Sequence, residues 1–579
     1  MKEKITEAIK KATGVEDPVV EYPANPEHGD YSTNVAMIMF PNSDVWSSLV
    51  RTDQSISSPH DLAELIVVKT REDKELSQSI SKIEVAGQGF INFYLSDEAL
   101  NSQLFKVLED KENFGKSKSE SKKIMVEYAH PNTHKELHIG HMRTLIVGEA
   151  LARILGFAGH EVFRANYQGD IGPHVAKAIW GTRKLLKKNK TGWEEAEALS
   201  KSEKAHLLGQ GYALGNSEYE ENKEEIHALN KALYALDDDV KEDYERTRRW
   251  SLEYYDIFYT RFDTKFDKLY FESEVSPRAL DLVKEYIGKV FTESEGAVIY
   301  DGEKHGLHKR VFITKEGYPT YEGKDIALAF AQFADFAFDT NIHVVASEQR
   351  GYFEVVFDAL NQIDPKFKSR EYHLSMGMVQ LVGKKMSSRT GDVFTVDQLL
   401  DEVKSHTREL IKSGKLEEEM EEIAEMTTMG AVKYSVLAAS ALQDVQFDVK
   451  KSVALDGNSG VYLQYTYART QSVLAKAIAQ GSRVPEKMVP QDNFSEHEKN
   501  ILRRLAKFPE IVKDAAISYS PHIICNYLYS LAQNYNAFYG VEQIVGSERE
   551  ALRLGLTAAT GQTIKNGLHL LGISAPEKM

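Results

Sequence analysis

Residues 124–167, which read IMVEYAHPNTHKELHIGHMRTLIVGEALARILGFAGHEVFRANY, decide the fold. The stretch begins with an apolar strand pattern at 124–128 and continues through a polar loop. Apolar side chains then repeat at helical spacing, at Met142, Leu145, Ile146, Ala150, Leu151, Ile154 and Leu155. A second strand pattern follows at 162–167. A strand, a helix and a strand in succession predict a parallel sheet, whose ligands bind at the carboxyl ends of the strands.

The rest of the chain divides into further parts by its hydrophobic patterns. Strand patterns return at 311–314 and 343–346, whereas helical spacing dominates from residue 397 to the end. We therefore expect an α/β multidomain protein. Its expected parts are an N-terminal α/β domain at 1–113, a parallel-sheet domain at 114–396 with a helical insertion around 183–290, a helical connecting region at 397–455, and an all-α helical bundle at 456–579.

Composition limits the classes of function. The 579 residues are 42% hydrophobic and 27% charged, which is typical of a globular protein. No apolar run approaches the roughly 20 residues that cross a bilayer, so we expect no membrane span, and the first residues do not resemble a secretory signal. The single cysteine, Cys525, excludes a disulfide framework and a thiolate-clustered metal site. We therefore expect a reducing, cytoplasmic location.

The net charge of −16 argues against indiscriminate nucleic-acid binding. The charge is unevenly distributed, because residues 461–579 carry 13 basic and 10 acidic side chains. A mildly basic end can still hold a polyanion, since salt confines electrostatic fields to about 10 Å. The composition therefore permits a nucleic-acid partner at this end of the chain without requiring one.

The string His138-Ile-Gly-His141 lies where the loop after the first strand enters the helix. The amide groups at a helix N-terminus point outward and the helix dipole adds partial positive charge, so this position suits a phosphate group. Gly140 allows a nucleotide to approach the backbone, and the two imidazoles can donate hydrogen bonds to a phosphoryl group. The alternative interpretation is two surface histidines at the start of an ordinary helix.

A second string, Gly383-Lys-Lys-Met-Ser-Ser-Arg-Thr-Gly-Asp392, places lysines, hydroxyls and an arginine between glycines. Such a cationic loop is suited to holding a triphosphate and to releasing pyrophosphate. Taken alone, this loop is as compatible with a basic surface hairpin as with a nucleotide site.

The pair of strings resembles the class I aminoacyl-tRNA synthetases, whose Rossmann-type catalytic domain carries both. Further blocks resemble the arginyl-tRNA synthetases and follow that family's order, at 26–34, 89–93, 127–141, 166–172, 320–327, 345–349, 462–469 and 567–579. The resemblance covers essentially the whole chain. It implies a Rossmann-type catalytic core between an α/β N-terminal domain that contacts tRNA and a helical anticodon-binding domain.

The resemblance implies an arginine–tRNA ligase that works in two steps. The carboxylate of arginine attacks the α-phosphorus of ATP and displaces pyrophosphate, and the terminal ribose hydroxyl of tRNA(Arg) then attacks the arginyl-adenylate. Orientation and charge stabilisation can carry both steps without a covalent enzyme intermediate. The implied ligands are L-arginine, tRNA(Arg) and ATP with Mg²⁺, with no permanently bound cofactor and no metal held by the protein. The family also implies that tRNA is bound during the first step.

The residues themselves suit arginine. A guanidinium is planar and permanently charged, so its pocket needs carboxylates and a flat apolar wall. Tyr321 and Asp325 are four residues apart and share a helical face, Glu127 can supply a second carboxylate, and Asn132 and Gln349 can hold the charged ends of the amino acid. By the family's pattern the arginine site comprises Glu127, His130, Asn132, His141, Tyr321, Asp325 and Gln349. The alternative is that Tyr321 packs in the core and Asp325 forms a helix salt bridge.

The same pattern implies catalytic roles for His138, Gly140, His141, Lys135 and Lys385, and an ATP site of His138, Gly140, His141, Lys384, Lys385, Met386, Ser387 and Ser388. Two positions depart from the family. Ser388 stands where many class I enzymes have a second lysine, and we expect Lys135 to share the phosphate charge with Lys385 in its place. His130 replaces a more usual serine, so either its side chain or only its backbone meets the ligand.

Two groups of residues are expected to contact tRNA. Tyr465, Tyr467 and Arg469 combine aromatic and cationic side chains, which suits stacking on unpaired anticodon bases. One of the tyrosines can instead belong to the helix core, because residues i and i+2 cannot both face inward. Asn92 and Phe93 are expected at the outer corner of the tRNA, although they are equally compatible with ordinary strand residues.

Three alternatives can be weighed from the sequence. Small nucleotidyltransferases also use an HxGH string, but they lack two flanking domains and a long helical end. An RNA-binding relic of a synthetase would have broken signatures, and both signatures are whole here. The class I lysyl enzyme also takes a cationic substrate, but the blocks at 127–141 and 320–349 argue against it. Each proposed site can be built from one chain, so we expect a monomer.

Overall fold

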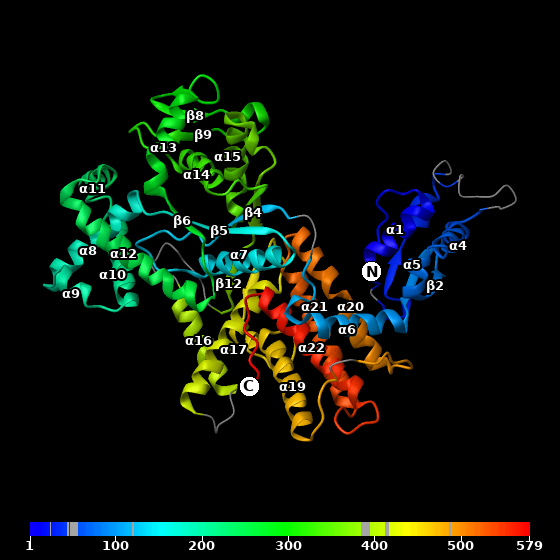
Figure 1. The fold of residues 1–579 in the computed structure, drawn as a ribbon. Helices are drawn as coiled ribbons and strands as arrows, with labels where there is room; N and C mark the ends of the chain where they lie inside the picture. Colours follow the sequence, from blue (N-terminus) through cyan, green and yellow to red (C-terminus); the bar gives the residue numbers. More distant parts are fainter. Residues whose placement is uncertain are drawn as a thin grey trace.

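The computed structural model describes residues 1–23, 25–42, 46, 56–117, 121–383, 394–410, 416–485 and 488–579. At its centre lies a five-stranded sheet with the order β11-β10-β4-β5-β6 (Figure 1). Its strands are β4 (Lys123–Glu127), β5 (Glu161–Gln168), β6 (Lys268–Phe271), β10 (Thr340–Ala346) and β11 (Glu371–Met376). All four pairings are parallel, so the predicted α/β fold with a parallel sheet is confirmed.

The predicted strand–helix–strand unit is β4, α7 (Ile139–Phe157) and β5. Every residue of the predicted apolar stripe is buried, and so are most other side chains of α7. The sheet covers one side of α7, and three C-terminal helices contact it as well: α17 (Glu417–Leu437), α20 (Glu496–Ile517) and α22 (Glu550–Leu570). This helix is therefore the joint between the sheet and the C-terminal part of the chain.

The side chains of β4 alternate between two hydrophobic cores. Ile124, Val126 and Tyr128 pack in the core that contains α7, whereas Met125 packs in the core on the opposite side of the sheet. Helices α13 (Glu272–Glu285), α14 (Tyr321–Asp335) and α15 (Arg350–Ile363) build that second core, together with a small antiparallel sheet of β7 (Thr292–Ser294), β8 (Ala297–Tyr300) and β9 (Arg310–Ile313) (Figure 1). Glu127 lies two residues after Met125 and therefore faces the same side of the sheet, the side covered by α14.

The insertion expected around 183–290 is only partly helical. Its helices form a separate lobe in Figure 1 and are α8 (Pro173–Asn189), α9 (Trp193–Glu197), α10 (Lys201–Ser217), α11 (Lys223–Ala235) and α12 (Asp238–Arg261). The same range also contains β6, which pairs with β5, and α13, which covers the sheet. Periodicity missed β6 because a strand of four residues at a sheet edge has too short a pattern to separate from a helix.

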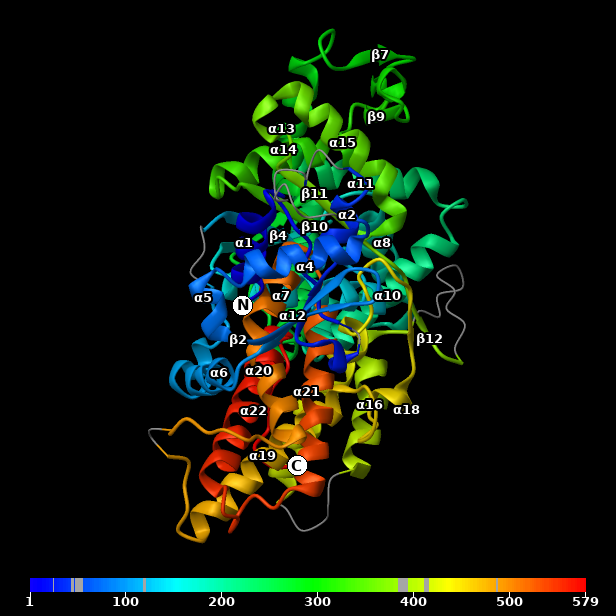
Figure 2. The ribbon, with the colours of Figure 1, turned by 90° about the vertical axis from the view of Figure 1, so that its right-hand side faces the viewer.

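The N-terminal domain combines helices with an antiparallel sheet, as predicted. The sheet has the order β1-β3-β2, from β1 (Tyr31–Thr33), β2 (Ile80–Ala86) and β3 (Phe90–Leu95), and the main helices are α1 (Lys2–Thr13), α4 (Pro59–Thr70), α5 (Lys74–Ser79) and α6 (Asp97–Asp110). The domain lies against α20, whose Glu510 accepts hydrogen bonds from the hydroxyls of Tyr22 (2.7 Å) and Tyr31 (3.0 Å) (Figure 2). The partly buried Glu510 carboxylate thus joins the N-terminal domain to a helix of the C-terminal part.

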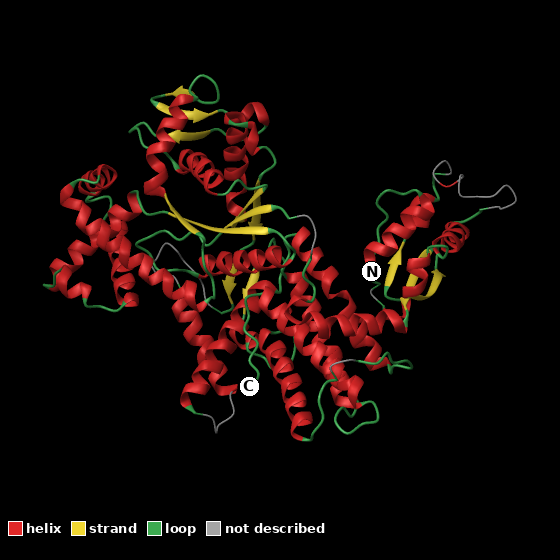
Figure 3. Cartoon of the chain, viewed as in Figure 1, coloured by secondary structure: helices red, strands yellow, loops and turns green. Residues whose placement is uncertain are grey.

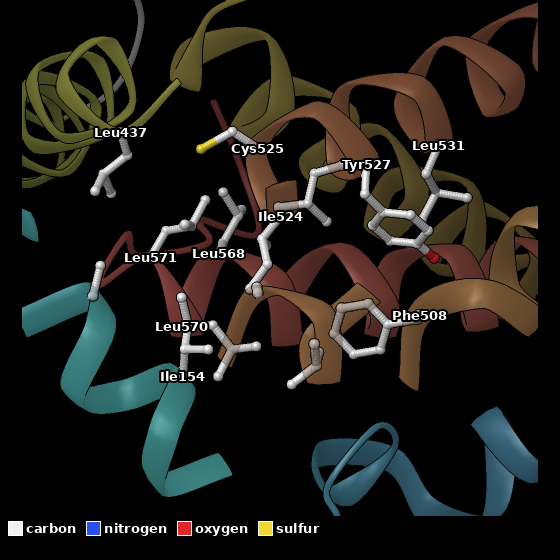
Figure 4. Close-up of a cluster of buried hydrophobic side chains, with 14 of the residues drawn as sticks. Ile154, Leu437, Phe508, Ile524, Cys525, Tyr527, Leu531, Leu568, Leu570 and Leu571 are labelled. Atoms are coloured by element: carbon white, nitrogen blue, oxygen red, sulfur yellow. The ribbon is translucent and has the colours of Figure 1, made fainter. Parts of the chain in front are cut away.

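The C-terminal part is a helical bundle, as predicted (Figure 3). Besides α17, α20 and α22 it contains α16 (Val396–Leu410), α19 (Gly460–Ala479) and α21 (His522–Val541). Figure 4 shows its core, where Ile154 of α7 lies among leucines of the chain's C-terminal end, such as Leu570, and near Phe508 of α20. The part of the chain around the central sheet and the C-terminal part therefore share one hydrophobic core.

The close approach of α7 to β4 gives a first prediction. A methyl group at Gly148 would lie 2.2 Å from the Tyr128 ring, which is fully buried. We expect Gly148→Ala to destabilise the fold by about 1–3 kcal/mol, because the helix must move away from the strand. Scanning calorimetry measures this as a lower melting temperature.

Gly156→Ala is the matched control on the same helix. A methyl group there meets nothing within 4 Å, so we expect it to stabilise the helix by about 0.5–1 kcal/mol. Equal melting temperatures for the two variants would contradict the proposed close packing at Gly148.

Candidate active site

The two histidines of the HxGH string cap the first turn of α7. Nδ1 of His138 accepts hydrogen bonds from the backbone N–H groups of Gly140 (3.1 Å) and His141 (3.4 Å). Nδ1 of His141 in turn accepts one from the backbone N–H of His138 (3.4 Å). The two rings stack with their centroids 3.7 Å apart. The histidines therefore form a reciprocal capping box made of two imidazoles.

This cap fixes where the protons lie. Burial lowers the pKa of both His138 and His141, so both rings are neutral at pH 7. Because each Nδ1 acts as an acceptor, the one proton of each neutral ring lies on Nε2. A side chain at Gly140 would come within 2.9 Å of the His138 ring, so the glycine makes room for the cap. The helix N-terminus thus keeps two imidazole N–H donors for a ligand.

The loop before α7 is held by α12. Within it, the backbone N–H of His134 donates to the Ser251 hydroxyl (2.9 Å), and Nε2 of His134 lies 2.7 Å from Oγ1 of Thr247. The Tyr255 hydroxyl donates to the carbonyl oxygens of Asn132 (2.6 Å) and Lys135 (2.9 Å). The helical lobe therefore sets the conformation of the loop at the candidate site residues Asn132 and Lys135.

Lys135 lies beside the capped histidines. After burial, its positive charge is the next cause that lowers the pKa of His138, and it also lowers that of His141. Its Nζ sits 4.0 Å from the ring centroid of Tyr212, which belongs to α10. A cation is thus positioned next to the helix N-terminus, and the helical lobe supplies an aromatic wall for it.

Glu127 is buried and fully engaged. Its Oε1 lies 3.1 Å from Nδ1 of His343 in β10, and its Oε2 accepts a hydrogen bond from Gln332 of α14. Burial opposes ionisation of Glu127, but the charge and hydrogen bond of His343 overcome it and lower the pKa to about 2. Nδ1 of His130 lies 3.6 Å from Oε1 of Glu127, so the His130 side chain turns toward this carboxylate.

Asp325 is the second carboxylate of this region, and it behaves oppositely. Its Oδ2 accepts a hydrogen bond from the Tyr352 hydroxyl (2.7 Å). Burial, opposed by that hydrogen bond and assisted by the charge of Glu127, raises the pKa of Asp325 to about 8. Asp325 lines one small cavity with Gln332 and His343. The two carboxylates therefore converge on the same region.

The structure also places the three remaining residues of the predicted arginine site. Tyr321 begins α14, one turn before Asp325, and is 56% exposed, so it is not a core residue. The amide of Asn132 lies against Gly169 at the end of β5, where an added methyl would meet its Oδ1 at 2.3 Å. Gln349 is exposed at the end of the short helix η5 (Ser347–Gln349), which follows β10. All three lie at carboxyl ends of strands or in the segments that follow them.

The structure describes the residues on either side of the second predicted string. Lys384, Lys385, Met386, Ser387 and Ser388 lie outside the described residues. Before them, β12 (Val379–Leu381) pairs with β13 (Val445–Phe447). After them, Thr395 forms a bridge with His138, and the backbone N–H of Val396 donates to the carbonyl of Leu137 (3.1 Å). The chain thus returns from this string directly to the histidine cap.

Sequence reasoning missed Arg143, two residues after the cap. Its buried guanidinium donates to the carbonyl oxygens of Met378 (2.8 Å) and Gln443 (2.6 Å), which precede β12 and β13. It also missed five residues around the carboxylates and Lys135, which are Tyr167, Tyr212, Gln332, His343 and Tyr352. Only Tyr167 lies in a recognised block, and its buried hydroxyl has no hydrogen-bond partner among the residues that the structure describes. The other four contact the site from distant segments, so no local pattern signals them.

The candidate tRNA contacts are only partly on the surface. Tyr467 is 3% exposed, which agrees with the alternative of helix-core packing and leaves little of its ring for the predicted contact with tRNA. Asn92 and Phe93 are also buried in β3, which agrees with the alternative that they are ordinary strand residues. Tyr465 is exposed, and the Arg469 guanidinium lies between its ring (4.9 Å) and that of Tyr539 (5.0 Å).

The described residues also bear on two other features, metal sites and membrane spans. Among the described residues, no group of three or more His, Cys, Asp or Glu side chains is placed to hold a metal ion. In the same part of the chain, no helix has the length and apolar character needed to cross a membrane.

Comparison with known proteins agrees with this geometry. The family model described as tRNA synthetases class I (R), catalytic domain, matches residues 103–449. The DALR anticodon binding domain matches residues 463–579, and the arginyl tRNA synthetase N terminal domain matches residues 1–95.

Relatives and solved structures point the same way. An arginine–tRNA ligase of Bacteroides thetaiotaomicron is 33% identical over 524 residues, covering 85% of this chain and 87% of that protein. One of Bdellovibrio bacteriovorus is 33% identical over 519 residues, covering 86% of each. The arginyl-tRNA synthetase of Thermus thermophilus superposes with a TM-score of 0.81 at 25% identity, covering 100% of this chain and 99% of that one. The chain therefore belongs to the arginyl-tRNA synthetase family of class I aminoacyl-tRNA synthetases, as its sequence predicts.

Proposed function

We propose that the chain is an arginine–tRNA ligase, which activates L-arginine with ATP and transfers it to the 3′ terminal ribose of tRNA(Arg). The observation that carries the proposal is the link between the two carboxylates and the start of α7: the charge of Glu127 acts on Asp325, and His130, whose Nδ1 lies 3.6 Å from Glu127, acts on His141 of the capped helix N-terminus. Aminoacylation of unfractionated tRNA with each labelled amino acid, with and without ATP, tests it. Charging with arginine alone and only with ATP is expected, and charging with another amino acid contradicts it.

Arginine binds with its guanidinium on Asp325 and the exposed ring of Tyr321. Asp325 keeps one carboxylate oxygen beyond its bond to Tyr352, and a tyrosine face is a suitable wall for a planar cation. Glu127 and His130 line the inner side. Asn132 and Gln349 hold the amino and carboxylate ends of arginine, because both follow carboxyl ends of strands.

ATP binds with its phosphates at the start of α7. The Nε2–H groups of His138 and His141 and the charge of Lys135 suit the phosphoryl oxygens, and Gly140 keeps the turn open. Lys384, Lys385, Met386, Ser387 and Ser388 complete this site in the proposal. Mg²⁺ is commonly bound through substrate phosphates, and in the proposal it arrives with ATP.

Adenylate formation then requires little beyond the correct placement of arginine and ATP. Arginine's carboxylate lies in line with the α-phosphorus, and the imidazole and lysine donors stabilise the charge that develops on the phosphoryl oxygens. The neutral state of both histidines suits this role, since a neutral ring with Nε2–H donates a hydrogen bond without first losing a proton.

Removing Lys135 tests the phosphate site. We expect Lys135→Ala to slow single-turnover adenylate formation, with tRNA present, by about 100-fold, because one cation is lost from the developing charge. Lys177→Ala is the matched control, since Lys177 also lies over a tyrosine of the helical lobe, Tyr219, at 4.1 Å but away from the cap. An unchanged rate for Lys135→Ala removes this lysine from catalysis.

The raised pKa of Asp325 predicts a pH dependence. A guanidinium pairs with the ionised carboxylate, so arginine binding strengthens as pH rises through about 8. We expect the arginine KM to fall about 25-fold between pH 6.5 and 8.5, because only the ionised fraction is competent to bind. Asp325→Asn should raise this KM and abolish its pH dependence.

Stability provides the control for Asp325. Because the folded-state pKa lies above the unfolded value, ionisation disfavours the folded state, and stability is lost as pH rises from about 4 through 8. Asp325→Asn should therefore not lower the melting temperature at pH 8. Asp335→Asn, on the same helix but paired with Lys268, should keep the wild-type KM profile. A pH-independent KM in the wild type would remove Asp325 from the arginine site.

We infer that tRNA contacts the bundle at Tyr465, Arg469 and Tyr539. A guanidinium between two exposed rings forms a platform on which unpaired bases stack. Tyr539→Ala should raise the KM for tRNA by about tenfold while the KM for arginine and ATP stays constant. Lys476→Ala is the control, because Lys476 is an exposed lysine of α19, the helix that carries Tyr465 and Arg469. Equal KM values for tRNA in the two variants would argue against this platform.

The proposal includes a cytoplasmic monomer. Cys525 is buried, which is compatible with a reducing compartment, and both halves of the proposed active site come from a single chain. Sedimentation at assay concentrations tests the oligomeric state.

A further inference from the structure

A buried polar chain runs from the arginine site through the sheet to its edge. It starts at Gln332 of α14, which donates to Glu127 of β4, and continues to His343 of β10. Nε2 of His343 then lies 2.7 Å from Oε2 of Glu371 in β11. The side chains of Glu127 and Glu371 are each 3% exposed, and that of His343 is 9% exposed. Four residues from three adjacent strands and one helix thus form one connected unit.

Geometry decides the charge of this chain. Each ring nitrogen of His343 faces a carboxylate oxygen, so each needs a proton to make its contact attractive. The ring is therefore an imidazolium, and its pKa is raised to about 10 by the two carboxylates in spite of burial. The rings of Phe353 (5.2 Å) and Phe357 (5.4 Å) pack against it and exclude water.

We propose that His343 and Glu371 are positioning residues that hold the Glu127 carboxylate and offset its charge, so that the guanidinium of arginine pairs with Asp325. The inference rests on the proposed arginine site. Both oxygens of Glu127 already accept hydrogen bonds inside the protein, whereas the Asp325 side chain has one hydrogen-bond partner among the described residues, Tyr352. Without the imidazolium, the buried carboxylates of Glu127 and Glu371 would have no cationic side chain within hydrogen-bond distance among the described residues, and they would take up protons.

Other titratable groups share this region and bear on any pH effect. They are His130 in the loop after β4, Tyr167 in β5, Glu272 in α13, Asp325 in α14, Arg350 and Tyr352 in α15, and His373 in β11. The pKa of His130 and of His373 is lowered, chiefly by burial, so these two rings are neutral near pH 7. His343 is thus the imidazolium that faces Glu127.

Two single variants should act in opposite directions. His343→Gln removes the cation, so the pKa values of Glu127 and Asp325 rise, and the pH at which the arginine KM reaches its plateau should move up by about one unit. Below that pH the arginine KM should increase about tenfold or more, with kcat at saturating arginine within about twofold. Glu371→Gln removes an anion and keeps an acceptor for His343, so the same midpoint should move down.

Phe357→Leu is the control for packing. It loosens the same cluster without changing a charge, so it should lower the melting temperature and leave the midpoint of the pH profile where it is. The double variant of His343 and Glu371 to Gln should give a midpoint between those of the single variants, because the two charge changes offset each other.

The outcomes separate the possible explanations. Shifts of the same sign in His343→Gln and Glu371→Gln, or no shift in either, would overturn the inference and leave a structural role only. If His343→Gln fails to fold, the downward shift in Glu371→Gln still decides the matter. If Asp325→Asn also leaves the arginine KM unchanged, the arginine site itself is wrong. Loss in Asp325→Asn with no effect of His343→Gln removes the positioning pair alone.

Discussion

The alternation of side chains along β4 is the constraint on which the site depends. Val126 and Tyr128 point to the core that contains α7, and Met125 and Glu127 point to the core built by α13, α14 and α15. A single strand therefore directs the helix proposed to bind phosphate to one face of the sheet and the carboxylate proposed for the arginine site to the other. Both faces meet at the strand's carboxyl end, where the loop to α7 begins. A shift of β4 by one residue would exchange the two faces and separate the two substrates.

The helical lobe acts as a brace as well as an insertion. Through Tyr255 it fixes the loop before the histidine cap, and the adjacent Tyr254 donates to Asp397 of α16 (2.9 Å). At its end, Arg261 pairs with Glu425 of α17 (2.9 Å). The same helix, α12, thus contacts the active-site loop and the helices that lead to the tRNA-binding bundle. In the proposed function, a rigid element that touches both regions offers a physical route by which tRNA on the bundle can influence the first chemical step.

The sequence predicted what local periodicity and short motifs encode. The strand–helix–strand unit, the position of His138 at the helix start and the helical face shared by Tyr321 and Asp325 all follow from spacing over a few residues. Exposure does not follow from spacing, and Tyr467 shows this, because the neighbouring helices of the bundle decide which tyrosine is covered. Long-range partners are equally hidden. His343 lies 216 residues from Glu127, and only the strand order brings the two side chains together.

The two carboxylates of the arginine site differ because their partners differ. Glu127 faces an imidazolium and stays ionised, whereas Asp325 faces a tyrosine hydroxyl and the negative charge of Glu127, and it tends to keep its proton. A substrate must therefore bring a cation that survives burial next to a carboxyl group of pKa about 8. A guanidinium remains charged in such a place, but an ammonium, whose pKa falls on burial, can pass its proton to the carboxylate and leave a neutral pair. Permanence of charge, together with the planar fork of donors, thus favours arginine over lysine at this site.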